Sequence, residues 1–597
     1  MKTSFALWVL NAFVPAVNAV GLAASVSSIP SQVCQIGDGQ VQVPNSQHGP
    51  QSTQLNQLGA AYNSPRSSPN LFWNGWGGDI YNNRWSPDAS INQSNVVSLH
   101  ETCGVQYHLG VSATPTVEGD VAYFPTWSGT LVALNYKSCS PVWEYNITKL
   151  INDYAPQSKF QSKLLFQTAR TSAVLDGDIL YFGTQPHALI VALNKTTGDL
   201  IARHQVNPHP FAVVTMSPTV YDGKVYVGAA SREEAAVRAV PNYQCCSFVG
   251  NMVSLELNAS AGAFHVRWNA STLPLNTQWS GGALWGSSPS IDVSRSQVFV
   301  GTGNVYSFPD SYSACRQDTG NISVIAKRFV SDPCLPKDVY QESVLALDLS
   351  TGFLNWVRQL SPLDAWTAAC GFGGSLQKPK AGRLPALCPY SPGPDADFGM
   401  APAFIPGSAN TPHGMDTLTI GQKNGNLYAL SAQAGTIFWA KATNPDGNIG
   451  GLSWGVAVDD RSVYFTAINS DLHPFTLVNG GPNITSSAFG AANLKTGDIM
   501  WETQSPGATF SIVPPTVAGD VVFFGRTDNG SGAPPYDTTP GGLIPVDKYT
   551  GKILTDLQTK TTFHGGIAVV GEYVMFGTGY EPPFNMTGGI SVWKVGA

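Results

Sequence analysis

The sequence predicts an all-β protein built as one eight-bladed β-propeller. A strand–turn–strand unit recurs eight times, glycine turns followed by tryptophan recur with it, and no segment shows a sustained 3.6-residue apolar period. The clearest copies are residues 121–135 and 418–431, and the others start at Ile179, Val225, Val298, Val463, Val521 and Val574. A two-sheet sandwich is the rival architecture, but it has no place for eight similar four-strand modules.

The turns of the repeat carry glycine because a tight turn requires a positive φ. They contain Gly198, Gly352, Gly435, Gly497 and Gly551. We expect the tryptophans of the repeat to pack between blades rather than to act in chemistry; these are Trp143, Trp356, Trp439 and Trp501. Insertions at 305–340 and 366–400 interrupt some repeats, and we expect them to roof the central channel.

The N-terminus has the pattern of a secretory signal peptide, with one lysine, an apolar run and small residues before position 20. A membrane anchor is the weaker interpretation because the run is short and Asn11, Pro15 and Asn18 interrupt it. We therefore predict a signal peptide at 1–19, an N-terminal extension at 20–70 and the propeller at 71–597. The protein is expected to be secreted, with no membrane span after removal of the signal.

Charged residues make up 12% of the chain and its formal net charge is −7. This composition provides no basic stripe for nucleic acid, so small neutral or weakly polar partners are expected. Export would make glycosylation sites of many of the nine N-x-S/T sequons, which begin at Asn92, Asn146, Asn194, Asn258, Asn269, Asn321, Asn483, Asn529 and Asn585.

Nine cysteines follow the signal and suit an oxidising compartment. Proximity along the chain favours three disulfides, Cys103–Cys139, Cys315–Cys334 and Cys370–Cys388, and leaves Cys34 over.

The repeat resembles that of the propellers that bind pyrroloquinoline quinone (PQQ), and it is most similar to polyvinyl alcohol dehydrogenase-like proteins. The resemblance runs from residue 72 to the C-terminus. It is carried by ordered stretches such as SREEAAVRAVPNYQCCSFVG, SGGALWGSSPSID, VGTGNVYS, DADFGMAPAF and IGQKNGNLYAL. It implies a quinoprotein alcohol dehydrogenase that uses PQQ and calcium (Ca²⁺) as cofactors.

PQQ is a flat quinone with three carboxylates, so its site needs an aromatic face and cations. The resemblance places Trp285 under the cofactor as its floor, and Arg170 and Lys423 against its carboxylates and quinone oxygens. Without the motif, Trp285 would be read as blade packing and the basic residues as solvated surface groups.

For calcium, which prefers oxygen ligands, the resemblance indicates Glu234 and Asn304. Glu233 is the alternative to Glu234, and Asn304 could instead cap a turn. In quinoprotein dehydrogenases a disulfide between neighbouring cysteines can cover the other face of the cofactor, which implies this role for Cys245 and Cys246. Separate partners for the two cysteines are the competing interpretation.

Alcohol oxidation also needs a carboxylate base. We select Asp338, which lies just before the strand where the family's catalytic aspartate sits, although the family's Gly-Asp-Asn context is absent. Asp364 falls in a motif that looks structural, and Asp395 and Asp397 could serve the hydrogen bonds of their own loop.

The sequence contains no Cys-x-x-Cys-His haem segment and no G-x-G-x-x-G dinucleotide motif. We therefore predict a secreted oxidoreductase that oxidises a small-molecule alcohol to a carbonyl and passes electrons to an external acceptor. The alternative is a propeller without cofactor that acts as a binding or scaffold protein, or as a biosynthetic enzyme using the central pocket.

Overall fold

The computed structural model describes residues 72–319, 332–371, 387–389, 392–447, 449–530, 539–580 and 586–596. The predicted signal peptide and N-terminal extension, Cys34, and the sequons at Asn321 and Asn585 lie outside these residues.

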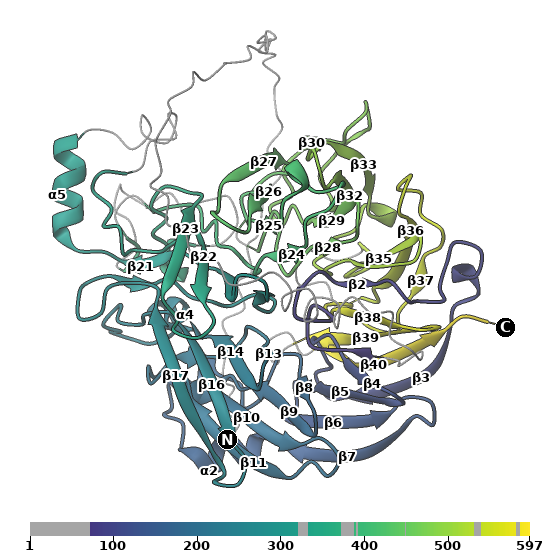
Figure 1. The fold of residues 1–597 in the computed structure, drawn as a ribbon, viewed down its shortest axis with the longest axis horizontal. Coiled ribbons are helices and arrows are strands. Elements are labelled where there is room, and N and C mark those ends of the chain that lie inside the picture. Colours follow the sequence, from purple (N-terminus) through teal and green to yellow (C-terminus); the bar gives the residue numbers. More distant parts are fainter. Residues whose placement is uncertain are drawn as a thin grey trace, which may run out of the picture. The chain divides into compact units, whose positions relative to one another are not determined.

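The first four blades are antiparallel sheets whose strands follow one another along the chain (Figure 1). Blade 1 contains β4 (Thr116–Glu118), β5 (Val121–Pro125), β6 (Thr130–Asn135) and β7 (Ser140–Asn146). Blade 2 contains β8 (Val174–Asp176), β9 (Ile179–Gly183), β10 (Leu189–Asn194) and β11 (Leu200–Gln205). Blade 3 contains β13 (Thr219–Tyr221), β14 (Lys224–Gly228), β16 (Asn251–Asn258) and β17 (Ala263–Ser271). Blade 4 contains β19 (Ser290–Asp292), β20 (Gln297–Gly301), β22 (Ser343–Asp348) and β23 (Leu354–Gln359).

The remaining blades complete the ring. Blade 5 contains β24 (Ala403–Ile405), β25 (Thr417–Gly421), β26 (Asn426–Ser431) and β27 (Ile437–Ala442). Blade 6 contains β28 (Ala457–Val458), β29 (Ser462–Ala467), β32 (Ala488–Asn493) and β33 (Ile499–Gln504). Blade 7 contains β34 (Thr516–Ala518), β35 (Val521–Arg526), β36 (Gly542–Asp547) and β37 (Leu557–Gln558). Blade 8 contains β38 (Ile567–Val570), β39 (Tyr573–Tyr580), β40 (Met586–Lys594) and β3 (His100–Tyr107).

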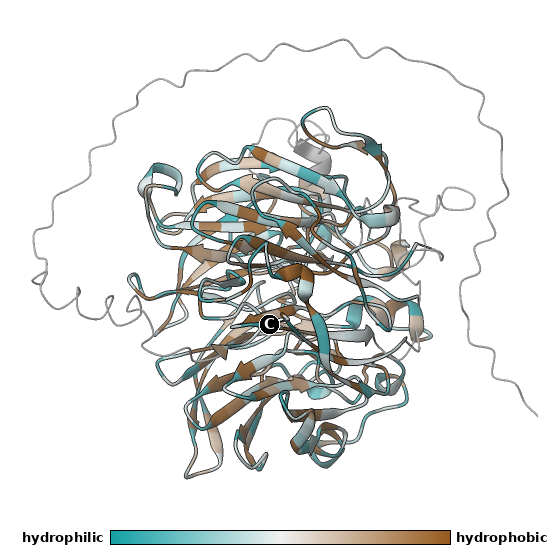
Figure 2. Cartoon of the chain, turned by 90° about the vertical axis from the view of Figure 1, so that its right-hand side faces the viewer, coloured by the Kyte–Doolittle hydropathy of each residue, from teal (hydrophilic) through white to brown (hydrophobic). Residues whose placement is uncertain are grey.

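The predicted all-β, eight-bladed propeller is confirmed, and each predicted repeat begins in or beside the second strand of its own blade. The first strands of neighbouring blades contact one another, as β8 does with β13 and β34 with β38, so they are the innermost strands. Apolar residues concentrate on the strands and hydrophilic residues in the turns (Figure 2).

The ring closes by pairing the beginning of the described chain with its end. Strand β3 adds to β40 at the outer edge of blade 8, from His100 opposite Lys594 to Tyr107 opposite Gly588. In Figure 1 the purple β3 lies beside the yellow β39 and β40. Blade 8 is therefore built from both ends of the described chain.

The segment 72–86 crosses the innermost strands of several blades. Its β1 (Phe72–Trp73) pairs with β4 of blade 1, and its β2 (Trp85–Ser86) runs parallel to β34 of blade 7. Between them, backbone carbonyls accept hydrogen bonds from blades 4, 5 and 6; the pairs are Ile80 with Ile291, Tyr81 with Phe404 and Asn83 with Val458. The fully buried Arg84 side chain donates to the carbonyls of Pro515 and Ile567, which ties blade 7 to blade 8.

As predicted, the tryptophans on the outermost strands pack between blades, and the structure shows that each binds the glycine turn of the next blade. Each indole Nε1 donates to a backbone carbonyl there; the pairs are Trp143 with Lys195, Trp356 with Ala432, Trp439 with Leu494 and Trp501 with Lys548. The sequence analysis missed a fifth pair, Trp268 with Leu349. A side chain on the turn glycine would collide with the ring, since a Cβ on Gly497 would lie 2.5 Å from Trp439.

Short elements lie in the loops. The helices are α2 (Ile147–Tyr154), α3 (Gln161–Leu164), α4 (Glu233–Ala239) and α5 (Asp310–Thr319), with 3-10 turns at Val96–Ser98, Pro186–Ala188, Ala368–Cys370, Pro412–Gly414 and Pro506–Ala508. Three ribbons pair β12 (Ala212–Val213) with β15 (Ala230–Ser231), β18 (Ser280–Gly281) with β21 (Val305–Ser307), and β30 (Phe475–Thr476) with β31 (Asn483–Ile484). Within the described residues, no helix has the length and apolar character to cross a membrane.

The three disulfides predicted from proximity are present, and Cys245 is bonded to Cys246.

Candidate active site

A pocket lies among the loops that lead into the innermost strands. It holds about 460 Å³ of unfilled space, part of it open to solvent. Most of its lining residues stand a few positions before the innermost strand of their blade; these are Ser112, Arg170, Thr215, Ser217, Trp285, Ser287, Trp454, Ile512 and His564, and Trp76 and Tyr580 complete the wall. Because the same position of the repeat recurs around the ring, side chains from seven blades converge on one space.

Trp285 is held in this pocket by polar and aromatic contacts. Its Nε1 donates to Asp397 Oδ2 over 3.0 Å, and its ring meets Trp454 edge to face at 5.2 Å. Gly399 packs so tightly against the indole that a Cβ there would lie 2.8 Å from it. The arrangement fixes the orientation of a large aromatic surface at the pocket wall.

Lys423 lies beside Trp285, in the turn between β25 and β26. Its Nζ is 3.1 Å from Asp395 Oδ2, 3.2 Å from Asp397 Oδ2 and 5.2 Å from the centre of the Trp285 ring. Burial opposes the charge of Lys423, but attraction to the two aspartates outweighs it and raises the pKa of the ammonium. Lys423 is therefore a fixed cation next to Trp285, although it does not itself line the pocket.

Asn304 contacts the same aspartate, Asp397, through its backbone. Its amide N–H donates to Asp397 Oδ1 over 2.7 Å, and its side-chain Nδ2 donates to the carbonyls of Val305 and Trp366. Since the amide nitrogen is committed to these two carbonyls, Oδ1 is the atom of Asn304 that is available to a cation.

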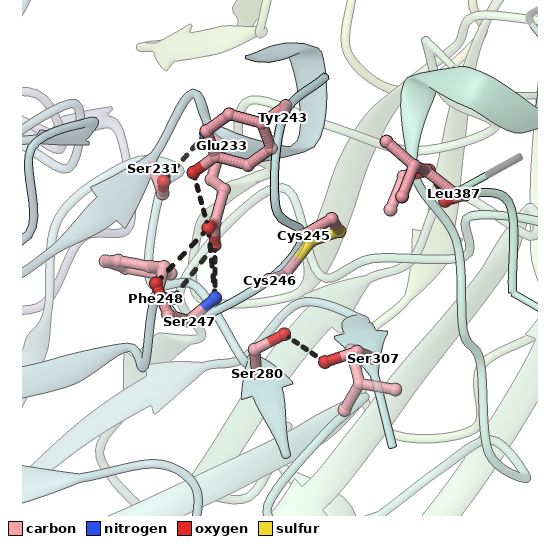
Figure 3. The surroundings of a disulfide bond; sticks show 12 residues. Ser231, Glu233, Tyr243, Cys245, Cys246, Ser247, Phe248, Ser280, Ser307 and Leu387 are labelled. Atoms are coloured by element: carbon pink, nitrogen blue, oxygen red, sulfur yellow. Dashed lines mark hydrogen bonds between the residues drawn. A yellow bond between two sulfur atoms is a disulfide. The ribbon is translucent and has the colours of Figure 1, made fainter. Parts of the chain in front are cut away.

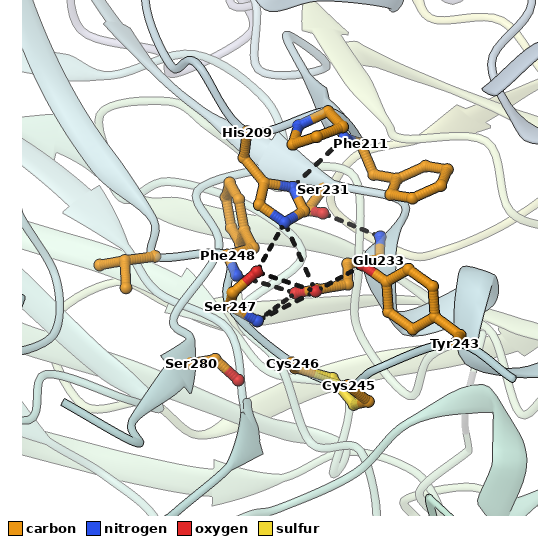
Figure 4. A network of polar contacts seen from close by, with 12 residues as sticks. His209, Phe211, Ser231, Glu233, Tyr243, Cys245, Cys246, Ser247, Phe248 and Ser280 are labelled. Carbon is orange, nitrogen blue, oxygen red and sulfur yellow. Dashed lines mark hydrogen bonds and ion pairs between the residues drawn. A yellow bond between two sulfur atoms is a disulfide. The ribbon is translucent and has the colours of Figure 1, made fainter. Parts of the chain in front are cut away.

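The two candidate glutamates at the start of α4 have different surroundings. Glu234 faces Asp397 and Lys423, and burial together with repulsion from Asp397 raises its pKa to about 7 against the opposing effect of Lys423 and Arg232. Glu233 is buried and accepts hydrogen bonds from Tyr243 Oη and from the backbone N–H groups of Ser247 and Phe248 (Figures 3 and 4). Glu233 thus anchors a loop, and Glu234 is the glutamate that belongs to the site.

The aspartates considered as bases also differ. Asp395 Oδ2 pairs with Lys423, whereas its buried Oδ1 has no hydrogen-bond partner among the described residues. Burial raises the pKa of Asp395 well above its usual range, although Lys423 opposes this. Asp364 accepts the backbone N–H groups of Asp395 and Ala396 and so holds their loop.

Asp338, the residue selected from the sequence, is exposed to solvent, and no hydrogen bond or ion pair joins it to this cluster within the described chain. The structure therefore brings together Trp285, Lys423, Glu234 and Asn304, and it leaves Asp338 outside.

The remaining predicted residues lie at two places. The Arg170 guanidinium lies 5.1 Å from the centre of the Trp454 ring and lines the pocket with Trp285. The Cys245–Cys246 disulfide follows α4 in the loop that Glu233 anchors, and it does not line the central pocket (Figure 3).

Sequence reasoning missed His564 and Trp454. His564 is buried in the pocket wall, neither ring nitrogen has a hydrogen-bond partner among the described residues, and burial lowers its pKa to about 3. Trp454 Nε1 is likewise without a partner there. Their position before the innermost strand, shared with Arg170 and Trp285, was the signal that could have identified them.

The charges of the cluster do not balance. Three carboxylates, those of Glu234, Asp395 and Asp397, lie near two cations: Lys423 pairs with both aspartates, and Lys423 and Arg232 both act on Glu234. An excess of buried negative charge with oxygen donors fits a hard divalent cation. The described residues nevertheless contain no group of three His, Cys, Asp or Glu side chains arranged to hold a metal.

Comparison with known proteins agrees with this architecture. A family model described as glucose/ethanol/alcohol dehydrogenase, β-propeller domain, matches residues 73–376, just over half of the chain, and one described as outer membrane protein assembly factor BamB matches residues 423–581. A polyvinylalcohol dehydrogenase of Sphingopyxis sp. is 27% identical over 553 residues, which cover 87% of this chain and 74% of the relative. Another, from a Pseudomonas species, is 26% identical and covers 73% of this chain and 59% of the relative.

Among solved structures, the quinohemoprotein alcohol dehydrogenase of Comamonas testosteroni matches with a TM-score of 0.61 at 18% identity, over 90% of this chain and 82% of that one. At this level of identity the likeness shows the fold alone.

Proposed function

Because the chain belongs to the PQQ-type family of alcohol dehydrogenases with a β-propeller domain, and is therefore an oxidoreductase of that class, we propose that it oxidises an organic alcohol to a carbonyl compound with PQQ and calcium. The observation that carries the proposal is the fixed indole of Trp285 beside a buried cation and a surplus of carboxylates.

The residues of the central pocket fit a flat polycarboxylate. Trp285 offers an aromatic face, and the Arg170 guanidinium makes no ion pair with any described residue, so its donors are available to a carboxylate. Trp454 Nε1 adds a donor without a partner in the described chain. Lys423 supplies a second fixed positive charge, which suits a quinone oxygen. When bound, PQQ would supply the two-electron acceptor that these side chains lack.

Glu234 and Asn304 are the residues that would hold calcium. Both offer an oxygen to the negatively charged cluster, and a divalent cation would offset the repulsion between Glu234 and Asp397. Charge balance supports this assignment.

Asp395 is the proposed base in place of Asp338. A general base must reach the hydroxyl proton directly, and Asp395 has a buried carboxylate oxygen without a partner among the described residues, whereas Asp338 is exposed. The pair with Lys423 orients Asp395, so its Oδ1 is the atom that would accept the proton. Cys245 and Cys246 remain proposed as a cofactor contact on the resemblance alone.

Export through the secretory pathway is proposed from the N-terminal pattern. The exposed sequons at Asn483 and Asn529 support glycosylation on that route. Electrons are proposed to pass to an external acceptor.

Calorimetric titration of PQQ into the purified protein, with and without calcium, followed by dye-linked oxidation of an alcohol panel, tests the proposal. We expect calcium-dependent PQQ binding and turnover of at least one alcohol. No binding of PQQ at millimolar calcium would refute it and favour the cofactor-free propeller.

A further inference from the structure

A second pocket lies beside α3 and α4, apart from the central one. It holds about 1060 Å³ of unfilled space, part of it open to solvent. Its wall is made of aromatic, proline and neutral polar side chains and contains no Asp, Glu, Lys or Arg; the rings come from Phe160, His187, His209, Phe211 and Tyr243. Such a lining fits an uncharged planar aromatic molecule.

The wall nearest α4 is rigid. Tyr243 Oη donates to Glu233 over 2.6 Å, and the Tyr243 ring meets Phe211 edge to face at 5.7 Å. His209 Nδ1 accepts the Phe211 backbone N–H, which leaves Nε2 directed at Ser247 and Glu233 (Figure 4). The pocket is therefore preorganised by the buried Glu233 carboxylate.

The helix α4 connects this pocket to the candidate active site. Glu234, at its start, belongs to the carboxylate cluster, and Val240, directly after its end, lines the second pocket. At 1.5 Å per residue the two lie about 9 Å apart along the helix axis. Trp285, in the wall of the central pocket, and Tyr243, in the wall of the second, also pack against one hydrophobic cluster, so packed side chains connect the two walls.

A row of aromatic rings spans the same gap. His209, in the pocket wall, meets Phe248 at 5.7 Å, and Phe248 stacks on Tyr306 at 6.2 Å. Tyr306 stands two residues after Asn304, and burial and the neighbouring carboxylates Glu234 and Asp397 raise the pKa of its hydroxyl.

An alcohol in the second pocket would be in the wrong place to react. A base must lie within hydrogen-bond distance of the hydroxyl proton, and Trp285, which contacts the carboxylate cluster through Asp397, lines the central pocket and not this one. Electrons, in contrast, tunnel through packed protein over distances such as the roughly 9 Å between Glu234 and Val240 along α4. The pocket therefore suits the molecule that receives the electrons.

We propose that the pocket beside α3 and α4 binds the electron acceptor, an uncharged quinone, and that electrons reach it along α4 and the row His209–Phe248–Tyr306. This inference rests on the proposed function. The alcohol loses two electrons and two protons to become a carbonyl compound, and these protons pass through Asp395 to solvent. The quinone gains the two electrons and takes two protons from solvent, to which its pocket is open, to become a hydroquinone. The quinone carbonyls need only hydrogen-bond donors, such as the amide of Gln205 in the pocket wall.

Phe160→Ala is the test variant because Phe160 is 44% exposed and its loss leaves the core intact. Phe353→Ala is the matched control, since Phe353 is 75% exposed on a turn of blade 4 and does not line the pocket. With the PQQ- and calcium-loaded protein and 2,6-dimethyl-1,4-benzoquinone as acceptor, we expect Phe160→Ala to raise the KM for the quinone about tenfold. The rate with ferricyanide, a charged acceptor, should not change, and the control should match the parent protein.

Calorimetric titration of 2,6-dimethylhydroquinone into protein without PQQ separates this inference from the proposed function. Binding that Phe160→Ala weakens and Phe353→Ala preserves supports the pocket even before any turnover is measured. An unchanged KM for the quinone in Phe160→Ala overturns the proposal. It is also overturned if the variant instead raises the KM for benzyl alcohol with ferricyanide as acceptor, because the pocket would then bind substrate.

Discussion

Asp395 pairs with Lys423 through one carboxylate oxygen and leaves its other oxygen buried without a partner among the described residues. This asymmetry distinguishes Asp395 from Asp397, both of whose oxygens accept hydrogen bonds from Trp285, Asn304 or Lys423. Only the unpaired oxygen can accept a proton without first breaking an existing contact.

Replacement of Asp395 tests its role as the base. Asp395→Asn keeps the shape of the side chain but removes the basic oxygen, so kcat for alcohol oxidation should fall by about 10²–10⁴-fold. PQQ affinity, measured by calorimetry, should change little. Asp338→Asn is the comparison, and we expect it to retain parental kcat; the reverse pattern would return the role to Asp338.

Trp285 should determine PQQ affinity. Trp285→Ala removes the aromatic face and its hydrogen bond to Asp397, and PQQ should bind at least about tenfold more weakly in calorimetric titration. Trp285→Phe restores a ring without the Nε1 donor and should recover part of the affinity. Equal affinity in the parent protein and Trp285→Ala would show that the indole is packing only.

Calcium affinity should depend on pH through Glu234. Without metal the pKa of Glu234 is about 7, above its usual value, so a proton occupies the carboxylate at lower pH and calcium must displace it. The apparent calcium affinity should therefore fall about tenfold for each pH unit below 7 and level off above it. Titrations from pH 5.5 to 8.5 measure this trend.

Glu234→Gln should bind calcium weakly and without this pH dependence. Glu233→Gln is the matched control, because Glu233 anchors backbone N–H groups of its loop; it should lower the thermal midpoint and leave the pH dependence of calcium binding in place. A pH dependence that persists in Glu234→Gln would remove Glu234 from the metal site.

The contact of tryptophan with the glycine turn should contribute to stability. A Cβ on Gly497 would lie 2.5 Å from the Trp439 ring, and the φ of +73° is itself unfavourable for alanine. Gly497→Ala should therefore cost about 2–4 kcal/mol in the free energy of unfolding. Gly119→Ala has a similar φ of +59° with no atom within 4 Å, so it should cost about 1 kcal/mol. Chemical denaturation of both variants measures the difference, and equal costs would show that the ring contact contributes nothing.

The propeller could be predicted from the sequence because its strands, turns and tryptophans repeat at short range. The path of 72–86 could not be predicted, because it is fixed by backbone carbonyls that accept hydrogen bonds from Ile291, Phe404 and Val458. Every residue has a backbone carbonyl, so such pairing leaves no mark in a sequence. Trp268 was missed for a simpler reason: it stands six residues after the glycine of its own turn, Gly262, whereas Trp356, Trp439 and Trp501 follow theirs by four.

Four residues of the site could be selected from the sequence because each stands in a long motif; these are Trp285, Lys423, Glu234 and Asn304. The base could not be selected from residue type. Four aspartates were available, and the choice depends on which oxygen lacks a partner. Asp364 determines which oxygen this is, because its carboxylate accepts hydrogen bonds from the backbone N–H groups of Asp395 and Ala396 and so fixes the conformation of their loop.

Strand β3 is synthesised early, yet its partner in blade 8, Met586–Lys594, is synthesised near the end of the chain. Until Met586–Lys594 has been made, β3 has no neighbouring strand, and the carbonyls of Pro515 and Ile567 that bind Arg84 are also made late. The nascent chain therefore carries an unpaired strand edge through almost the whole of its synthesis, and an unpaired edge is a site of aggregation. A nonsense mutation that removes Met586–Lys594 will therefore also leave β3, from the other end of the described chain, without its partner.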